Sequence, residues 1–162
     1  MMPPLARLAL AALLLSAPLT ASAQSVSFGQ RADVGAPVEV TADNLSVDQG
    51  TGLATFSGNV LIGQGEMRLA ADSVTVTYAQ DGPERISAMR AQGNVTLVNG
   101  PDAAEAARAD YDVSGGNVVL TGDVVLTQGA NVLAGERVEV DLATGRANVT
   151  GRVRSIFQPG SQ

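Results

Sequence analysis

Carboxylates are the commonest side chains in this 162-residue chain that could do chemistry, and four follow an alanine or glycine in successive repeats: Asp43, Asp72, Asp110 and Glu136. Paired carboxylates act as acid and base in glycoside hydrolysis, and clustered carboxylates bind Ca²⁺. A residue that recurs once per repeat is more typical of a turn that accepts backbone hydrogen bonds. The segment at 110–112 also lacks the glycine-punctuated ligand series of a calcium loop. We therefore predict no catalytic residue and no metal site.

The missing residue types exclude most other catalytic chemistry. The chain has no histidine, cysteine or tryptophan, and all ten basic residues are arginine. These absences exclude Ser-His-Asp and Cys-His nucleophiles, His- or Cys-ligated metals, disulfides and lysine chemistry. The net charge of −6 argues against a nucleic-acid partner, and an aromatic content of 3% is too low for a stacking platform. We expect no cofactor, and the composition favours a binding or structural protein over an enzyme.

The sequence repeats itself, and the repeats define the elements that position these side chains. Phe56–Gly65 aligns with Leu120–Gly129, and the match continues from Leu69–Tyr78 to Leu133–Leu142. A Gly-x-Val segment recurs with its glycine at positions 58, 93, 122 and 151, at intervals of 35, 29 and 29 residues. Self-similarity with such a period indicates a repeat architecture.

Each repeat shows the alternation of apolar and polar residues that is typical of β-strands, as in the Val-x-Val segments at 74–76 and 138–140. The Gly-Asn and Gly-Asp pairs that precede the Val-x-Ile/Leu runs, and the Gln-Gly pairs that follow them at 64–65 and 128–129, are predicted as turns or sharp bends. Ala103–Ala109 has helical propensity, but its alignment with 65–71 favours a strand. We predict an all-β domain of short antiparallel strands in one folded-over sheet, with unpaired edge strands at both ends.

The predicted domain follows an export signal. Residues 1–23 contain Arg7, an apolar run and the small-residue site Ala21-Ser22-Ala23, which together indicate a cleavable signal peptide. We expect residues 24–36 to be a flexible segment, 37–157 to be the β domain and 158–162 to be a disordered tail. The product should be exported, into the periplasm if the source is a Gram-negative bacterium.

Four segments carry a resemblance to a known family: Pro37–Asp48, Ala54–Gly65, Leu69–Val76 and Val118–Val140. Their pattern of Ala-Asp, Phe-x-Gly-Asn-Val, Gln-Gly and Ala-Asp resembles the OstA-like family of lipopolysaccharide-transport proteins over about residues 37–157. The resemblance implies a β-jellyroll, or "β-taco", whose apolar interior holds the acyl chains of lipid A. It also implies head-to-tail self-association, an LptC-like inner-membrane partner at the N-terminal edge and an LptD-like outer-membrane partner at the C-terminal edge.

Strand alternation places one apolar set on one face, which is either a packed core or a lipid groove open along one side. The predicted groove residues are Val38, Val40, Phe56, Val60, Ile62, Leu69, Val74, Val76, Val95, Leu97, Leu120, Val124, Leu126, Val138 and Val140. Leu97 stands where the family has an aromatic residue, and Tyr78 where it has an arginine. Arg68, Arg137 and Arg152 are predicted at the rim, as contacts for a head group.

Two other functions are alternatives to the lipid carrier. A ligand-free, self-assembling structural repeat protein of the cell envelope would have a fully packed interior. A polysaccharide-acting enzyme would need two carboxylates that project from one cleft, and the regular placement of acids in this chain provides no such pair. The lipid-carrying protein that bridges two membranes is the function we favour.

Overall fold

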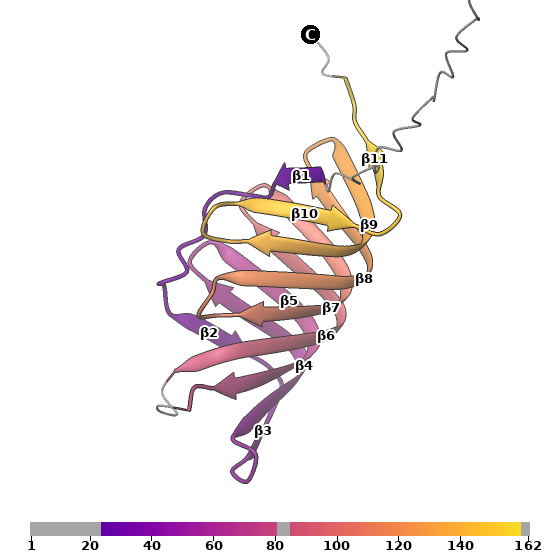
Figure 1. Cartoon of the computed structure of the whole chain (residues 1–162). Helices are drawn as coiled ribbons and strands as arrows, with labels where there is room; N and C mark the ends of the chain where they lie inside the picture. The colour runs from indigo at the N-terminus through magenta and orange to yellow at the C-terminus, as the bar shows by residue number, and fades with distance from the viewer. Residues whose placement is uncertain (1–23, 81–84, 160–162) are drawn as a thin grey trace, which may run out of the picture.

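A computed structural model describes residues 24–80 and 85–159, and these ranges form a β structure (Figure 1). The strands are β1 (Gln24–Ser27), β2 (Val38–Thr41), β3 (Asn44–Asp48), β4 (Leu53–Gln64), β5 (Met67–Tyr78), β6 (Ile86–Asn99), β7 (Asp102–Asp112), β8 (Asn117–Gln128), β9 (Asn131–Asp141), β10 (Arg146–Thr150) and β11 (Arg154–Ile156). They pair in one sheet of order β1-β10-β9-β8-β7-β6-β5-β4-β2, with β3 also on β4 and β11 also on β9. The predicted all-β fold is confirmed, and the described ranges contain no helix that could cross a membrane.

Neighbouring strands from β4 to β10 are also neighbours in the chain, and short turns connect β4 to β5 and each pair of consecutive strands from β6 to β10. Ala103–Ala109 lies within β7, as predicted, although alanine favours helices. Its inward alanines face larger side chains, for example Ala104 between Leu97 and Leu126. Packing across the sheet thus overrides local propensity.

The long strands bend where a pair of left-handed residues interrupts the pairing. In β6, Gly93 and Asn94 have φ angles of +80° and +45°, and the register with β7 shifts between Gln92 and Val95. Equivalent left-handed pairs lie at 58–59, 122–123 and 151–152. Such bulges increase twist and bend a strand. Stacked in successive repeats, they form a line along which the sheet folds over, so that its two halves face each other (Figure 1).

The recurrent acidic residues stand opposite these bulges and have a structural role. The Nδ2 atoms of Asn59 and Asn94 donate to the carboxylates of Asp43 and Asp72, both at 2.8 Å. In the third repeat the residue opposite Gly122 is Ala107. The alignment of Asp110 with this position was therefore wrong, because the similar Ala-Asp dipeptide lies three residues further along.

The N-terminal segment differs from the flexible segment that we expected. Gln24–Ser27 pairs with β10 at the far end of the sheet from β2, and Phe28 is fully buried. The chain then runs along one side of the sheet to reach β2 (Figure 1). The predicted signal peptide at 1–23 lies outside the described residues, as do 81–84 and 160–162, while Gln158 in the predicted tail donates to Asn131 Oδ1 at 3.3 Å.

Candidate functional site: the apolar interior of the folded sheet

The inward side chains of successive strands lie in rows that run the length of the sheet. One row pairs Ile62 with Leu69, then Leu97, Ala104 and Leu126. Each of these five side chains is at most 2% exposed. The interior is therefore a continuous apolar surface built from one residue per strand in each row.

All fifteen predicted groove residues lie in or against this interior. Three of them, Val38, Val40 and Phe56, are partly buried against it. The other twelve are buried: Val60, Ile62, Leu69, Val74, Val76, Val95, Leu97, Leu120, Val124, Leu126, Val138 and Val140. The structure thus brings the set together on one face.

Alternation based on valine and leucine missed several interior residues. The missed side chains are Phe28, Met67, Met89, Ala91, Ala104, Ala109 and Tyr111. Most continue the two-residue period through alanine or methionine, so a looser definition of the apolar class would have found them. Phe28 has no such signal, because it lies outside the repeats.

The interior is closed in this structure, which differs from the groove that we expected to be open along one side. An internal cavity between Ile62, Met67, Met89 and Tyr111 has a volume of only about 10 Å³. Such a space is too small for an acyl chain, which would have to separate the two halves of the sheet. The methionine side chains that line the cavity are flexible, so they can repack when the two halves separate.

The ends of the strands, away from the fold line, border an opening between the two halves of the sheet, which we call the mouth. Amide side chains line one side of the mouth. Gln64, Asn99 and Gln128 end β4, β6 and β8, at the same position in each repeat. Gln64 Nε2 donates to the carbonyl oxygens of Val34 and Ala36, at 2.9 and 3.0 Å. Gln64 and Gln128 were predicted only as turn residues and Asn99 was not singled out, although the recurrence of an amide at this position was the available signal.

The remaining amides bind the same N-terminal segment. Asn99 Nδ2 donates to the Gln30 carbonyl at 2.7 Å, and Gln128 Nε2 donates to the Ser27 carbonyl. The Asp102 carboxylate accepts from the Gly29 amide at 2.6 Å and from Gln128 Nε2 at 2.7 Å. In the described part of the chain, the buried polar side chains are Gln64, Asn99 and Asp102. All three bind this one segment.

The opposite side of the mouth also contacts the N-terminal segment. The amides of Phe28 and Ala32 donate to the carbonyl oxygens of Gly145 and Leu142, at 2.8 and 2.9 Å. Tyr111 extends from β7 across the mouth, and its hydroxyl donates to Gln64 Oε1 at 2.5 Å. The segment from 24 to 36 therefore lies between the two halves of the sheet and closes the mouth.

The three predicted rim arginines separate into one that lies near the mouth and two that do not. Arg68 Nη1 donates to the carbonyls of Gly65 and Met67, in the turn that follows β4. Arg137 points outward beside the inward Val138 and pairs with Glu139 at 2.7 Å. Arg152 lies in the last bulge, 3.8 Å from Glu136. The rim prediction is therefore not met at Arg137 and Arg152, because alternation and the bulge direct them away from the mouth.

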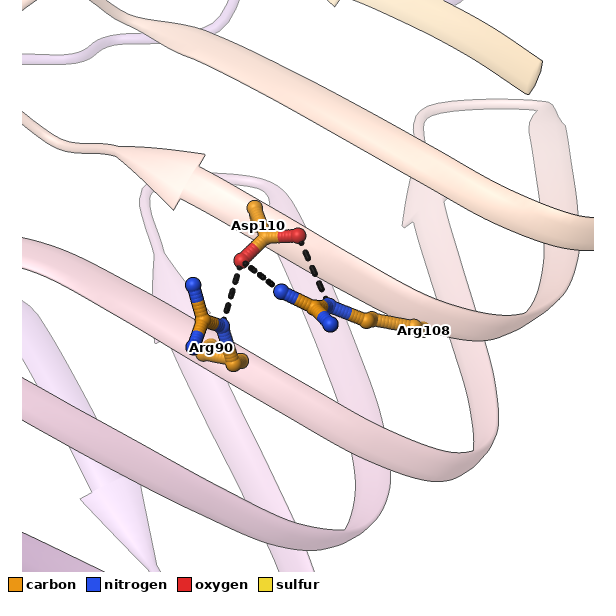
Figure 2. Close-up of polar contacts among 3 residues, drawn as sticks. All are labelled: Arg90, Arg108 and Asp110. Atoms are coloured by element: carbon orange, nitrogen blue, oxygen red, sulfur yellow. Dashed lines mark hydrogen bonds and ion pairs between the residues drawn. The ribbon is translucent and has the colours of Figure 1, made fainter.

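A charge cluster on the outer face gathers two further arginines. Asp110 Oδ1 lies 2.7 Å from Arg90 Nε, and Asp110 Oδ2 lies 2.9 Å from Arg108 Nε (Figure 2). Partial burial alone would raise the pKa of Asp110, but the hydrogen bonds and charges of Arg108 and Arg90 outweigh it and lower the pKa. Asp110 lies between the inward residues Ala109 and Tyr111, so the cluster faces away from the interior of the sheet. The described residues contain no group of acidic side chains that could hold a metal ion.

Both ends of the sheet expose large apolar side chains. Leu45 and Val47 on β3 are 57% and 59% exposed. They pair with Phe56 and Ala54, so they continue the interior face to the edge. At the other end, Ile156 and Phe157 are 55% and 62% exposed. Exposed apolar residues on unpaired edge strands favour association with another chain.

Comparison with known proteins yields one family. A model of the family described as LptA/(LptD N-terminal domain) LPS transport protein matches residues 39–146. The lipopolysaccharide export system protein LptA of Escherichia coli K12 is 30% identical over 137 residues, which cover 82% of this chain and 73% of that protein. LptA of Haemophilus influenzae is 28% identical over 139 residues, with 82% and 81% covered.

A solved structure has the same fold. The crystal structure of LptH, the LptA-homologous periplasmic component of the lipopolysaccharide transport device of Pseudomonas aeruginosa, superposes with a TM-score of 0.70. The sequences are 23% identical, and the match covers 79% of this chain and 99% of that one. The family match and the shared fold agree with the resemblance in the repeats, and the chain belongs to the LptA/LptD N-terminal-domain (OstA-like) family of lipopolysaccharide transport proteins.

Proposed function

We propose that this protein carries lipopolysaccharide across the periplasm, with the lipid A acyl chains in the interior of the folded sheet. The observation that carries the proposal is the continuous apolar interior, which reaches the edge of the sheet at Leu45 and Val47. Transfer from water gains about 0.8 kcal/mol per CH₂, so a chain of about ten methylenes would gain about 8 kcal/mol. Similar aliphatic side chains along the rows favour sliding over binding at one point.

The edges support the proposed bridge between membranes. The β2/β3 edge would pair with an LptC-like inner-membrane partner, and the edge at β1 and β11 would pair with an LptD-like outer-membrane partner. A second copy could dock in the same way, head to tail. Exposed apolar side chains at both ends support these contacts, because an apolar edge that stayed in water would be unfavourable.

A ligand-free structural filament is the second candidate, and the packed interior favours it. A cavity of about 10 Å³ gives no space for a chain unless the sheet opens. In that case the apolar ends alone would drive assembly. The two candidates therefore differ in whether the interior ever contacts lipid.

Site-specific photo-crosslinking in cells separates the two candidates. A photoreactive residue at Val40 or Leu97 should crosslink to lipopolysaccharide, since both side chains belong to the inward face. The matched control is Thr77, which is exposed on β5. Because Leu97 is fully buried and its replacement could disturb folding, the partly buried Val40 provides an independent position. Crosslinks at the inward positions alone support the carrier, and no lipid crosslink at any inward position favours the filament.

A further inference from the structure

We propose that residues 24–36, the closing segment, are a releasable cover whose β1 end leaves β10 when the interior admits acyl chains. This inference rests on the proposed function for the ligand that enters. The closing segment contacts both sides of the mouth, and its contacts are of a different kind from those that join the repeats to one another.

The closing segment is bound mainly through its backbone. Gln64, Asn99 and Gln128 donate to carbonyl oxygens of the segment, and Asp102 accepts from one of its amides. Such a row of side-chain amides holds an extended chain in register without requiring particular side chains from it. When the segment leaves, these groups can bond to water, and each exchange changes the free energy by only about 1 kcal/mol.

The side chains of the segment provide a single large anchor. Phe28 is fully buried, whereas Val26, Ala32 and Val34 are only partly buried against the core. The intervening Arg31 and Asp33 are exposed. A cover that was a permanent part of the core would bury more apolar surface, because burial is the main source of stability.

The connectivity of the segment determines which end can be released. Its C-terminal end continues into β2, which is paired with β4. Its N-terminal end is β1, a four-residue strand at the edge of the sheet with β10 as its neighbour. Release must therefore start at β1, and it would expose the outer edge of β10. Opening of the interior and exposure of an edge for another chain would then be one event.

An engineered disulfide lock between β1 and β10 tests the release. Because the chain has no native cysteine, no other disulfide can form within it. Ser25 and Asn148 are exposed cross-strand partners in β1 and β10, so the variant S25C/N148C ties the segment down. The control N148C/E139C joins β10 to β9 and leaves β1 free. Binding of fluorescently labelled lipopolysaccharide should weaken at least about tenfold in the oxidised lock, return on reduction and stay constant in the control.

Equal binding by the oxidised and reduced lock would overturn the cover while leaving the proposed function intact. If neither the reduced lock nor the unmodified protein binds lipopolysaccharide, the proposed function fails and amide exchange decides on the cover. Without lipid, the Phe28 and Ala32 amides should exchange at least about 100-fold faster than those of β5–β8. Equal protection in the two regions would contradict a releasable segment.

Phe28→Ala provides the second variant. It should speed exchange of the segment and leave exchange in β5–β8 unchanged, because the anchor of a separate cover does not support the core. Equal acceleration in β5–β8 would show that the segment is an integral part of the core and would overturn the proposal.

Discussion

Gln64 and Tyr111 join the two sides of the mouth with a complete set of hydrogen bonds. Gln64 uses its amide group to bind two carbonyls of the closing segment, and its Oε1 accepts from the Tyr111 hydroxyl. Burial raises the pKa of Tyr111, and the negative charge of Asp112 raises it further. The net effect keeps the hydroxyl protonated, as a donor requires.

Tyr111→Phe is expected to lower the free energy of unfolding by about 1–2 kcal/mol, because it leaves the buried Gln64 oxygen without a donor. Urea unfolding at pH 7 measures the change. The control is Tyr78→Phe, since among the described residues the structure gives the Tyr78 hydroxyl no partner. A similar loss in both variants would contradict the importance of the contact between the two sides of the mouth.

The same tyrosine should govern the alkaline stability of the protein. The raised folded-state pKa of Tyr111 contributes stability that is fully present below the unfolded-state pKa of about 10 and is lost as the pH rises through the folded-state pKa. With no lysine or cysteine in the chain, few other side chains titrate in this range. Unfolding midpoints measured from pH 8 to 11 should fall more steeply for the unmodified protein than for Tyr111→Phe. Parallel curves would refute this assignment.

The bulges are the elements that turn a flat sheet into a folded one. At each bulge, two left-handed residues lie opposite one residue of the neighbouring strand. Along the fold line, a change in the second left-handed residue is accompanied by a change in the residue that faces it. Asn59 and Asn94 face aspartates, Asp123 faces the uncharged Ala107, and Arg152 faces Glu136. The chemistry at each crossing therefore avoids two facing carboxylates.

Gly93→Ala should be more destabilising than Gly52→Ala. Gly93 has φ +80°, and an added Cβ would overlap the Asp72 carboxylate. Gly52 has φ +68° but has no other group within 4 Å of an added Cβ, so its substitution reports backbone strain alone. We expect a loss of about 1 kcal/mol for Gly52→Ala and about 2–3 kcal/mol for Gly93→Ala by chemical unfolding. Equal losses would show that the contact with Asp72 contributes nothing.

At the scale of the whole molecule, the protein has a packed apolar interior, two ends that expose large apolar side chains, and a net negative charge. The interior rows continue to the β3 edge at Leu45 and Val47, whereas Ile156 at the other end pairs with Val132, on the opposite face from the buried Leu133. On the outer face, Arg90 and Arg108 are both paired with Asp110 (Figure 2). Assembly and lipid binding should therefore depend on apolar contacts.

The double variant L45K/V47K should weaken head-to-tail association at least about tenfold, because charge on an edge strand opposes pairing with another chain. Sedimentation velocity over a range of protein concentrations measures the effect. Leu61→Lys is the matched control, since Leu61 is 45% exposed on β4, one strand in from the edge. Unchanged association in L45K/V47K would exclude this edge as the interface.

Lipopolysaccharide binding should depend only weakly on salt. The protein has a net charge of −6 and its ligand is anionic, so there is no net electrostatic attraction between them for salt to screen. Affinity measured between 50 and 500 mM NaCl should change by less than about threefold. A steep loss of affinity with salt would indicate that arginines, with Arg68 the first candidate, dominate binding.

The sequence alone determined the strand pattern, most of the inward set and the bends. A two-residue period depends only on local backbone geometry, so it identified residues such as Val74 and Leu120 as inward without knowledge of their partners. Repeated Gly-Asn pairs revealed the bends for the same reason, since the left-handed conformation is a property of those residues. The misplaced repeat position at Asp110 shows the limit, because similarity of letters does not determine register.

Only the tertiary structure decided how the mouth is closed. The contacts that close it join residues distant in the chain: Gly29 to Asp102 are 73 residues apart, and Ser27 to Gln128 are 101 apart. No local pattern encodes such pairs, because their formation depends on the sheet having already folded over. For the same reason the packed interior and the position of β1 beside β10 followed from three-dimensional packing and not from the order of residues.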